Sequence, residues 1–277
     1  MNVRELLAWG RQRLESHSAG PLEAEVLACK SLGVSRAWLY ANPGSQPDDD
    51  QQTAYRGLVE RRVAGEPVAY LTEVREFWSM PLKVSPDVLI PRPETELLVE
   101  IVLEAIPRAA QWRIADLGTG SGAIALALAI ERPGCEVHAT EYSQAALCLA
   151  QENGRLIAPG RVRFHHGSWL SPLQGRFDVL VSNPPYIASN DPHLQLGDCR
   201  FEPADALTPG RDALAALHHI ADEARHYLRP GGLLAFEHGF DQGMVVRKLM
   251  IELGYSGVVT RTDLEKRDRA TVGNFGG

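Results

Sequence analysis

The stretch IADLGTGSGA at residues 114–123 decides the fold class, because it joins a predicted strand to a predicted helix through three alternating glycines. Gly118, Gly120 and Gly122 let the backbone turn tightly and approach a ligand closely. The order is GxGxG after an acid, and not the GxGxxG that cradles a pyrophosphate. The carboxylate of Asp116 would repel a phosphate, so the loop favours a ligand that carries an ammonium group.

Strands and helices alternate around this loop from Trp112 onwards. Strands are predicted near 112–117, 135–140, 161–166, 177–182 and 232–237, helices near 121–131, 143–154, 211–228 and 241–253, and two final strands between about 256 and 275. Such alternation is typical of a parallel sheet with helices on both faces, so we predict an α/β fold.

The N-terminal residues 1–72 have a helical pattern and carry no recognisable chemistry. Apolar or small residues fall on one helical face at Val3, Leu6, Leu7, Gly10 and Leu14. Pro21 is a favourable helix start. The acidic triplet 48–50 opens a further helix, where the helix dipole stabilises negative charge. We interpret this segment as a domain for binding or positioning a partner.

Residues 73–92 are β-rich and lead into the sequence IPRP at 90–93, in which two prolines around Arg92 forbid a continuous helix. A new helix is predicted from Pro93, with Glu94 and Glu96 in its first turn. We therefore divide the chain into a helical domain 1–72, a linker 73–92 and an α/β domain 93–277.

Composition narrows the class of protein further. The formal net charge of -7 counts against an affinity that comes mainly from neutralising nucleic-acid phosphates, although it does not exclude a local basic patch. The four cysteines form no CxxC pair and the histidines no HExxH, so we predict reduced thiols and no metal. The N-terminus lacks a signal peptide and the apolar stretch 124–130 is too short to span a bilayer. We expect a cytoplasmic protein without a membrane partner.

A second acid follows the next predicted strand, at Glu141, 23 residues after Gly118. An acid at this point can accept hydrogen bonds from both hydroxyls of a ribose. S-adenosylmethionine is the common cofactor that combines a nucleoside with an amino-acid end, and it fits both carboxylates. Asp116 and Glu141 could each merely cap a helix, but their spacing as a set favours this cofactor. Thr119 lies in the same loop and is included among its expected contacts.

A third loop, GSWL at residues 167–170, follows the next predicted strand. Its position places it against the adenine of the expected cofactor. Ser168 could hydrogen bond to the adenine amine, although an acid often occupies this site. Trp169 could flank the adenine or belong to the core, and the sequence leaves both readings open.

The sequence SNPPY at residues 182–186 stands at the end of the fourth predicted strand of the α/β domain, where ligands bind in open α/β sheets. The oxygen of Asn183 and the carbonyl of Pro184 can each accept one N–H of a planar NH₂ group. These bonds would hold the nitrogen towards the methyl donor and stabilise the charge that develops on it. Pro185 stiffens the loop and Tyr186 offers a flat surface. An Asn-Pro turn without chemistry is common, but it leaves the aromatic residue and the strand-end position unexplained.

With these motifs in place, the chain resembles a known family, the bacterial release factor glutamine methyltransferases, also called PrmC or HemK. The resemblance runs over nearly the whole chain and is carried by GEP with YL (65–71), REF (75–77), PRPETE (91–96), the loop 116–122, NPPY (183–186) and RFEP (200–203). NPPY alone is shared with other amino-methyltransferases, whereas PRPETE combined with it is highly specific. Two residues depart from the pattern: Ser168 replaces an acid, and Glu73 stands where glycine is expected.

The resemblance implies a Rossmann-like, seven-stranded class I methyltransferase sheet with a small helical N-terminal domain and a β-hairpin linker. It also implies N5-methylation of the glutamine in the GGQ loop of class 1 peptide chain release factors. We expect Arg92 to hold the linker or touch the substrate backbone, His238 to be structural, and the protein to be a monomer.

Three alternative functions stay open at this stage. A glutamine methyltransferase acting on a ribosomal protein would share the fold, the cofactor and the catalytic loop. A nucleic-acid amino-methyltransferase would need base extrusion and a basic channel, against which the net charge counts. A cofactor-binding protein without catalysis is disfavoured by the intact NPPY loop.

Overall fold

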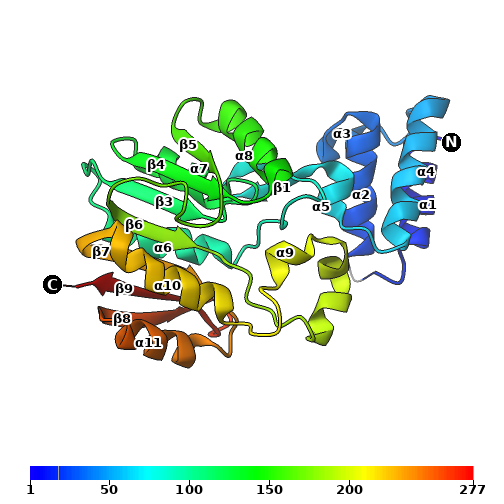
Figure 1. The fold of residues 1–277 in the computed structure, drawn as a ribbon. Coiled ribbons are helices and arrows are strands. Elements are labelled where there is room, and N and C mark those ends of the chain that lie inside the picture. Colours follow the sequence, from blue (N-terminus) through cyan, green and yellow to red (C-terminus); the bar gives the residue numbers. More distant parts are fainter. Residues whose placement is uncertain (18, 277) are drawn as a thin grey trace. The chain divides into compact units, whose positions relative to one another are not determined.

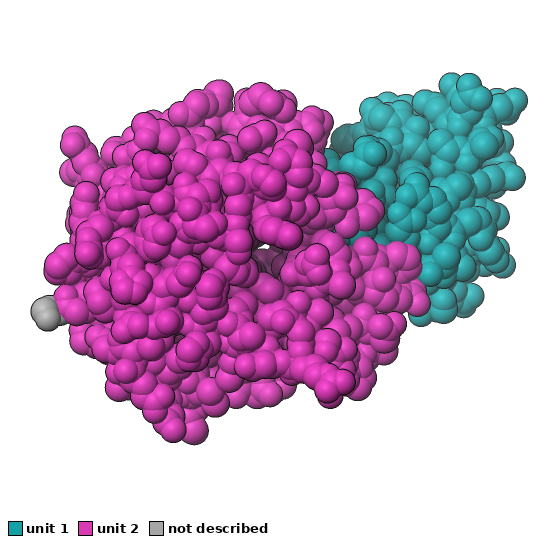
Figure 2. Space-filling view, in the orientation of Figure 1, with its two compact units in different colours: residues 1–74 teal, residues 75–277 magenta. Residues whose placement is uncertain are grey.

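The computed structural model describes residues 1–17 and 19–276, so Ser18 and Gly277, which belong to the predicted domains 1–72 and 93–277, lie outside the described residues. The chain divides into two compact units, Met1–Val74 and Arg75–Gly277, which Figure 2 distinguishes by colour. Within the described part of the chain, no helix is both long enough and apolar enough to cross a membrane.

The first unit is built from helices packed around one apolar core. They are α1 (Val3–Arg13), α2 (Gly20–Leu32), α3 (Arg36–Ala41), α4 (Asp49–Val63) and α5 (Val68–Thr72). The predicted helix starts are confirmed, because Pro21 lies in the first turn of α2 and Asp48 caps α4. The predicted apolar face of α1 is confirmed as well, since all of its members are buried: Val3, Leu6, Leu7, Gly10 and Leu14.

Glu73 follows α5 in the left-handed backbone region, with a φ of 63°. Glycine is favoured in this region because it has no Cβ to clash with the following carbonyl. The backbone therefore explains why the family pattern has glycine before Val74. The Glu73 carboxylate is exposed and lies 2.7 Å from Lys30 Nζ.

The second unit contains a β-hairpin and an α/β domain (Figure 1). The hairpin consists of β1 (Val74–Phe77) and β2 (Met80–Lys83). The strands of the main sheet are β3 (Arg113–Leu117), β4 (Glu136–Glu141), β5 (Val162–His166), β6 (Phe177–Ser182), β7 (Leu228–Glu237), β8 (Tyr255–Thr262) and β9 (Asp268–Phe275). The helices are α6 (Thr95–Ala105), α7 (Ala123–Glu131), α8 (Gln144–Ile157), α9 (Ala204–Leu207), α10 (Ala215–Tyr227) and α11 (Gly243–Glu252), with short 3-10 turns at Pro192–Gln195 and Gly197–Phe201.

The main sheet has seven strands in the order β5-β4-β3-β6-β7-β9-β8. All pairs are parallel except those made by β9, which runs antiparallel to β7 and β8. This order confirms the predicted seven-stranded, Rossmann-like sheet. The chain order reverses beside β3, where β4 lies on one side and β6 on the other. Ligands bind at such a switch point, beyond the carboxyl ends of the strands.

Helices cover both faces of the sheet, and alternate side chains of its strands pack against them. On one face, Ile114, Val137 and Val181 pack with α6, α7 and the hairpin. On the other face, Leu117 and Phe236 pack with α10 and α11. Strand pairing aligns the carboxyl ends of β3, β4 and β6, because Asp116 stands opposite both Ala139 and Val181.

Several predicted boundaries are wrong by a few residues; α10, for example, begins at Ala215 and not at residue 211. Helix α6 begins at Thr95 and not at Pro93, because the N–H groups of Thr95 and Glu96 donate three residues back and form a tight turn before the helix. Helix α7 begins at Ala123 and not at residue 121, since Gly122 still has a positive φ. Strand β7 begins at Leu228, and an irregularity between Leu228 and Leu233 separates its two pairings with β6.

Candidate active site

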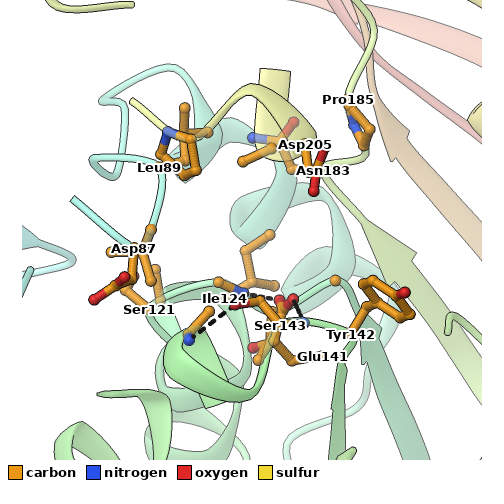
Figure 3. A pocket seen from close by; sticks show the side chains of 18 of the residues that line it. Asp87, Leu89, Ser121, Ile124, Glu141, Tyr142, Ser143, Asn183, Pro185 and Asp205 are labelled. Carbon is orange, nitrogen blue, oxygen red and sulfur yellow. Dashed lines mark hydrogen bonds between the residues drawn. The ribbon is translucent and has the colours of Figure 1, made fainter. Parts of the chain in front are cut away.

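A cavity of about 370 Å³ opens at the carboxyl ends of β3, β4, β5 and β6, within the size range of small-molecule sites. Nine of the predicted site residues line it: Arg92, Gly118, Thr119, Gly120, Glu141, Ser168, Trp169, Asn183 and Pro185. Four predicted site residues lie outside its lining: Asp116, Gly122, Pro184 and Tyr186. Figure 3 shows Asn183, Pro185 and Asp205 on one side of the cavity and Glu141, Tyr142 and Ser143 on the other.

The glycine loop after β3 adopts the conformation that its sequence predicts. Gly118, Gly120 and Gly122 have φ values of 72°, 56° and 89°, where a side chain would be strained. At Gly118 the restriction is also one of space, since a Cβ would lie 2.8 Å from Cζ3 of Trp169. The indole of Trp169 therefore covers the first glycine and also packs against the core under α10, which agrees with the predicted core role. Its predicted contact with the adenine stays a prediction.

Asp116 is fully buried beneath the cavity. Its Oδ2 accepts from the Thr119 hydroxyl at 2.6 Å and from the backbone N–H of Ala125 at 3.2 Å. Its Oδ1 has no hydrogen-bond partner among the described residues. Burial raises the pKa of Asp116 to about 7, and the nearby charge of Glu141 adds to this rise, while the two hydrogen bonds oppose it.

Glu141 ends β4 and lines the cavity directly. Its Oε2 accepts from the N–H of Gly120 and its Oε1 from the N–H of Ser143, both at 2.9 Å (Figure 3). A carboxylate oxygen can accept more than one hydrogen bond, so both oxygens keep capacity for a ligand. Tyr142, which the sequence prediction missed, is exposed and lines the same wall.

The loop after β5 places Ser168 at the cavity, where its side chain is exposed. It therefore lies where the sequence prediction put it, with a hydroxyl that could meet a ligand. Its carbonyl accepts from the N–H of Ser171, and this bond closes the turn.

Asn183 follows β6 and points into the cavity (Figure 3). Its Nδ2 donates to the Thr95 hydroxyl of α6 at 3.2 Å. An amide whose NH₂ faces the protein presents its oxygen to the other side. Pro184 is buried. The predicted hydrogen bond between its carbonyl and a substrate stays a prediction.

Tyr186 has a role in the structure that the sequence did not indicate. Its hydroxyl donates to Oε1 of Glu237 at 3.2 Å, and its backbone carbonyl accepts from Nε2 of Gln242 at 2.9 Å. Burial and the neighbouring carboxylate raise the pKa of Tyr186 well above its ordinary value, so the phenol stays protonated. Its predicted flat contact with the substrate stays a prediction.

Arg92 forms an ion pair with Glu202, whose side chain is fully buried. The other oxygen of Glu202 accepts from the N–H of Ile90 at 3.0 Å. The pair thus joins the PRPETE and RFEP segments at the rim of the cavity, and of the two predicted roles for Arg92 it supports that of holding the linker. His238 is fully buried and hydrogen bonds to Thr271 and to the carbonyl of Gly239, which agrees with its predicted structural role.

Sequence reasoning assigned no role in the site to Thr95 and Tyr142, which line the cavity, or to Glu237, which accepts a hydrogen bond from Tyr186. Tyr142 had a signal, because it directly follows the acid at the end of β4. Thr95 lies in the PRPETE motif, but no sequence rule connects Thr95 or Glu237 to its partner, which is far away in the chain. Among the described residues, no three His, Cys, Asp or Glu side chains gather closely enough to hold a metal ion.

Comparison with known proteins defines the class. A methyltransferase from Pyrococcus furiosus superimposes with a TM-score of 0.55 at 20% identity, covering 79% of this chain and 98% of its own. A 16S rRNA methyltransferase from T. Thermophilus, in complex with AdoMet and guanosine, does so with a TM-score of 0.50 at 21% identity, covering 67% and 43%. At these identities the likeness shows the fold alone. Together with a match of residues 94–211 to the methyltransferase small domain, it makes this fold that of a methyltransferase.

The family follows from closer relatives. Residues 5–72 match the PrmC N-terminal domain. The release factor glutamine methyltransferase of Xylella fastidiosa is 48% identical over 98% of both chains. That of Vibrio cholerae is 46% identical over 98% of this chain and 95% of its own. The chain belongs to the release factor glutamine methyltransferase family.

Proposed function

We propose that this chain transfers a methyl group from S-adenosylmethionine to the side-chain nitrogen N5 of the glutamine in the GGQ loop of class 1 peptide chain release factors. The observation that carries this proposal is the Asn183 amide, held by Thr95 with its oxygen towards the cavity. The name of the relatives supports a release factor as the partner. The assignment of the GGQ loop as the methylated segment rests on the resemblance of the sequence to the family.

The residues around the cavity fit S-adenosylmethionine. Asp116 Oδ1 is a buried acceptor without a partner in the described part of the chain, and such an atom is costly unless a donor reaches it. Glu141 has oxygens free to accept from ribose hydroxyls, and the glycine loop leaves room for close approach of a ligand. In this proposal Asp116 and Thr119 hold the amino-acid end, Glu141 the ribose, and Ser168 with Trp169 the adenine.

When bound, S-adenosylmethionine supplies an electrophilic methyl group on its sulfonium sulfur. The residues of the chain then have to align a poor nucleophile, since the lone pair of an amide nitrogen is delocalised into its carbonyl. Asn183 Oδ1 and the Pro184 carbonyl would each accept one N–H of the glutamine side chain. These two bonds aim the nitrogen and stabilise the positive charge that develops on it. No general base is needed, because an alkylated amide nitrogen loses its proton readily to water.

We also propose that residues 1–72 recognise the protein substrate, since none of their described residues lines the cavity. Deletion of this segment should leave cofactor affinity unchanged, as measured by calorimetry, and should slow methylation of an intact release factor. Full-rate methylation by the shortened enzyme would assign recognition to the rest of the chain.

The proposed substrate class is tested by incubating the enzyme with radiolabelled S-adenosylmethionine and purified release factors, ribosomal proteins and DNA in parallel. Label should enter the release factors alone. Transfer to a ribosomal protein would favour the first alternative function. Transfer to DNA would favour a nucleic-acid amino-methyltransferase, which extrudes the target base into the same pocket.

A further inference from the structure

Glu237, the last residue of β7, is a carboxylate that the mechanism above does not use. It is buried, with an exposed fraction of 2%, and it lies against Tyr186 of the NPPY loop. Its Oε1 accepts from the Tyr186 hydroxyl at 3.2 Å. The Thr95 hydroxyl lies close enough to the carboxylate to lower its pKa. Its Oε2 has no hydrogen-bond partner among the described residues. A buried charge is expensive, so its retention at this point calls for a role.

Thr95 connects this carboxylate to Asn183. A hydroxyl has one proton to donate, and an ionised carboxylate can only accept. When the Thr95 proton points to Glu237, the Thr95 oxygen can only accept a hydrogen bond on its other side. The group on that side is Asn183, which must therefore offer its NH₂, as the observed Nδ2 to Oγ1 contact of 3.2 Å requires. The Asn183 oxygen is then left for the cavity.

A second contact connects the end of β7 with the NPPY loop. Gln242, five residues after Glu237, donates from Nε2 to the carbonyl of Tyr186, and its Oε1 accepts from the N–H of Gly239 at 2.9 Å. The segment from Glu237 to Gln242 therefore binds Tyr186 of the NPPY loop twice, through its hydroxyl and through its backbone carbonyl.

We propose that Glu237 is a positioning residue for methyl transfer, whose carboxylate fixes the direction of the Thr95 hydrogen bond and thereby the orientation of the Asn183 amide. We refer to Glu237, Thr95 and Asn183 as the orienting relay. This inference rests on the proposed function in one respect, namely that the Asn183 oxygen accepts from the nitrogen to be methylated.

The relay has a built-in dependence on pH. Burial raises the pKa of Glu237 to about 6, and Glu94, just before α6, also raises it, whereas the Thr95 and Tyr186 hydrogen bonds and Arg269 of β9 lower it. Burial lowers the pKa of His238, the next residue in the chain, which favours its neutral form. Below about pH 6 Glu237 takes up a proton and can donate to Thr95. The Thr95 proton is then free to point at Asn183, and the amide loses its fixed orientation.

The relay is tested with the full-length enzyme and saturating S-adenosylmethionine, by single-turnover rates of T95V, T95S and E237Q between pH 5 and pH 8.5. T95V should slow transfer roughly 10- to 100-fold, as expected for a misplaced catalytic group, with cofactor affinity unchanged. T95S keeps the hydroxyl and should recover most of the rate. The wild type should show an acid limb near pH 6, whereas E237Q should be slow at all pH values and lack this limb.

T271V is the matched control, because it removes a buried hydroxyl that bonds to His238 and has no link to Asn183. Its transfer rate should equal that of the wild type. A wild-type rate in T95V, or an acid limb near pH 6 in E237Q, overturns the relay. If E237Q does not fold, the T95V and T95S pair decides. Rates are taken on whichever acceptor the wild type methylates, so an error in the proposed substrate shows in the acceptor panel and not in the rate ratios.

Discussion

The two sides of the cavity each rest on one buried carboxylate, but they are assembled over very different distances along the chain. We refer to the wall where we propose that S-adenosylmethionine binds as the cofactor side, and to the wall with Asn183 as the acceptor side. On the cofactor side, Asp116 bonds to Thr119 and Ala125, which are three and nine residues away. On the acceptor side, the bond from Asn183 to Thr95 spans 88 residues, and that from Tyr186 to Glu237 spans 51. Each carboxylate also keeps one oxygen without a partner among the described residues.

This difference suggests separate tasks for the two sides, namely cofactor binding on one and alignment of the substrate amide on the other. The cofactor side is a strand, a turn and a helix that fold as one local unit, so its geometry depends on backbone conformation. The acceptor side exists only when α6, β6 and β7 are packed together. Substitutions on the first side should therefore act on cofactor affinity and stability, and substitutions on the second side on the rate of transfer.

The largest effect is expected on the acceptor side. N183A removes one of two acceptors for the substrate N–H groups and should lower the single-turnover rate by about 10²–10³, the loss seen when one positioned electrostatic contact is removed. The dissociation constant of the cofactor, measured by calorimetry, should barely change. N183D keeps an acceptor oxygen but loses the donor to Thr95, so we expect intermediate activity. A near-normal rate in N183A would refute the alignment mechanism.

On the cofactor side, the largest effect should be on stability. G118A forces a Cβ into the left-handed region and to within 2.8 Å of the Trp169 ring. Backbone strain and overpacking together should lower the free energy of unfolding by roughly 2–4 kcal/mol. G120A is the matched control, because its Cβ would meet no atom within 4 Å, and it should cost about 1–2 kcal/mol. Denaturant unfolding without cofactor compares the two, and equal losses would show that Trp169 does not restrict the loop.

Asp116 should give the cofactor side a pH dependence. Because burial raises its pKa to about 7, the free enzyme carries a neutral Asp116 below that pH and a carboxylate above it. An ammonium group needs the carboxylate, so cofactor affinity should fall as the pH drops through 7. D116N should bind about 10- to 100-fold more weakly at pH 8, the value of a hydrogen bond to a charged group, and its affinity should be flat with pH. Calorimetry from pH 6 to pH 8.5 measures both, and wild-type affinity in D116N would remove Asp116 from the site.

The smallest effect is expected outside the cavity, at Glu73. E73G relieves a positive φ of 63° but also frees the unfolded chain, so it should change the free energy of unfolding by no more than about 1 kcal/mol, towards greater stability. E73A keeps the strain and loses the exposed ion pair with Lys30, and should stay within about 0.5 kcal/mol of the wild type. Thermal unfolding distinguishes these outcomes. A clear loss of stability in E73G would mean that the ion pair matters more than the backbone.

The same contrast explains what the sequence predicted. The sheet, the glycine loop and the acids at Asp116 and Glu141 follow from periodicity, from glycine conformation and from strand ends, all of which are local. The burial of Asp116 beneath Thr119 was not predictable, because the pattern does not show which side of the turn faces the ligand. Thr95 and Glu237 were missed since no spacing rule connects residues 95, 183 and 237. Their relation depends on how α6 and β7 pack around β6.

The central claim is that the cavity aligns the side-chain amide of a glutamine for methyl transfer. Its most direct test is tandem mass spectrometry of a release factor after a single turnover with the wild-type enzyme and, in parallel, with N183A. The account predicts one methyl group on the side-chain nitrogen of the GGQ glutamine with the wild type, and almost none in the same time with N183A. A methyl group on any other residue, or equal modification by both enzymes, would contradict it.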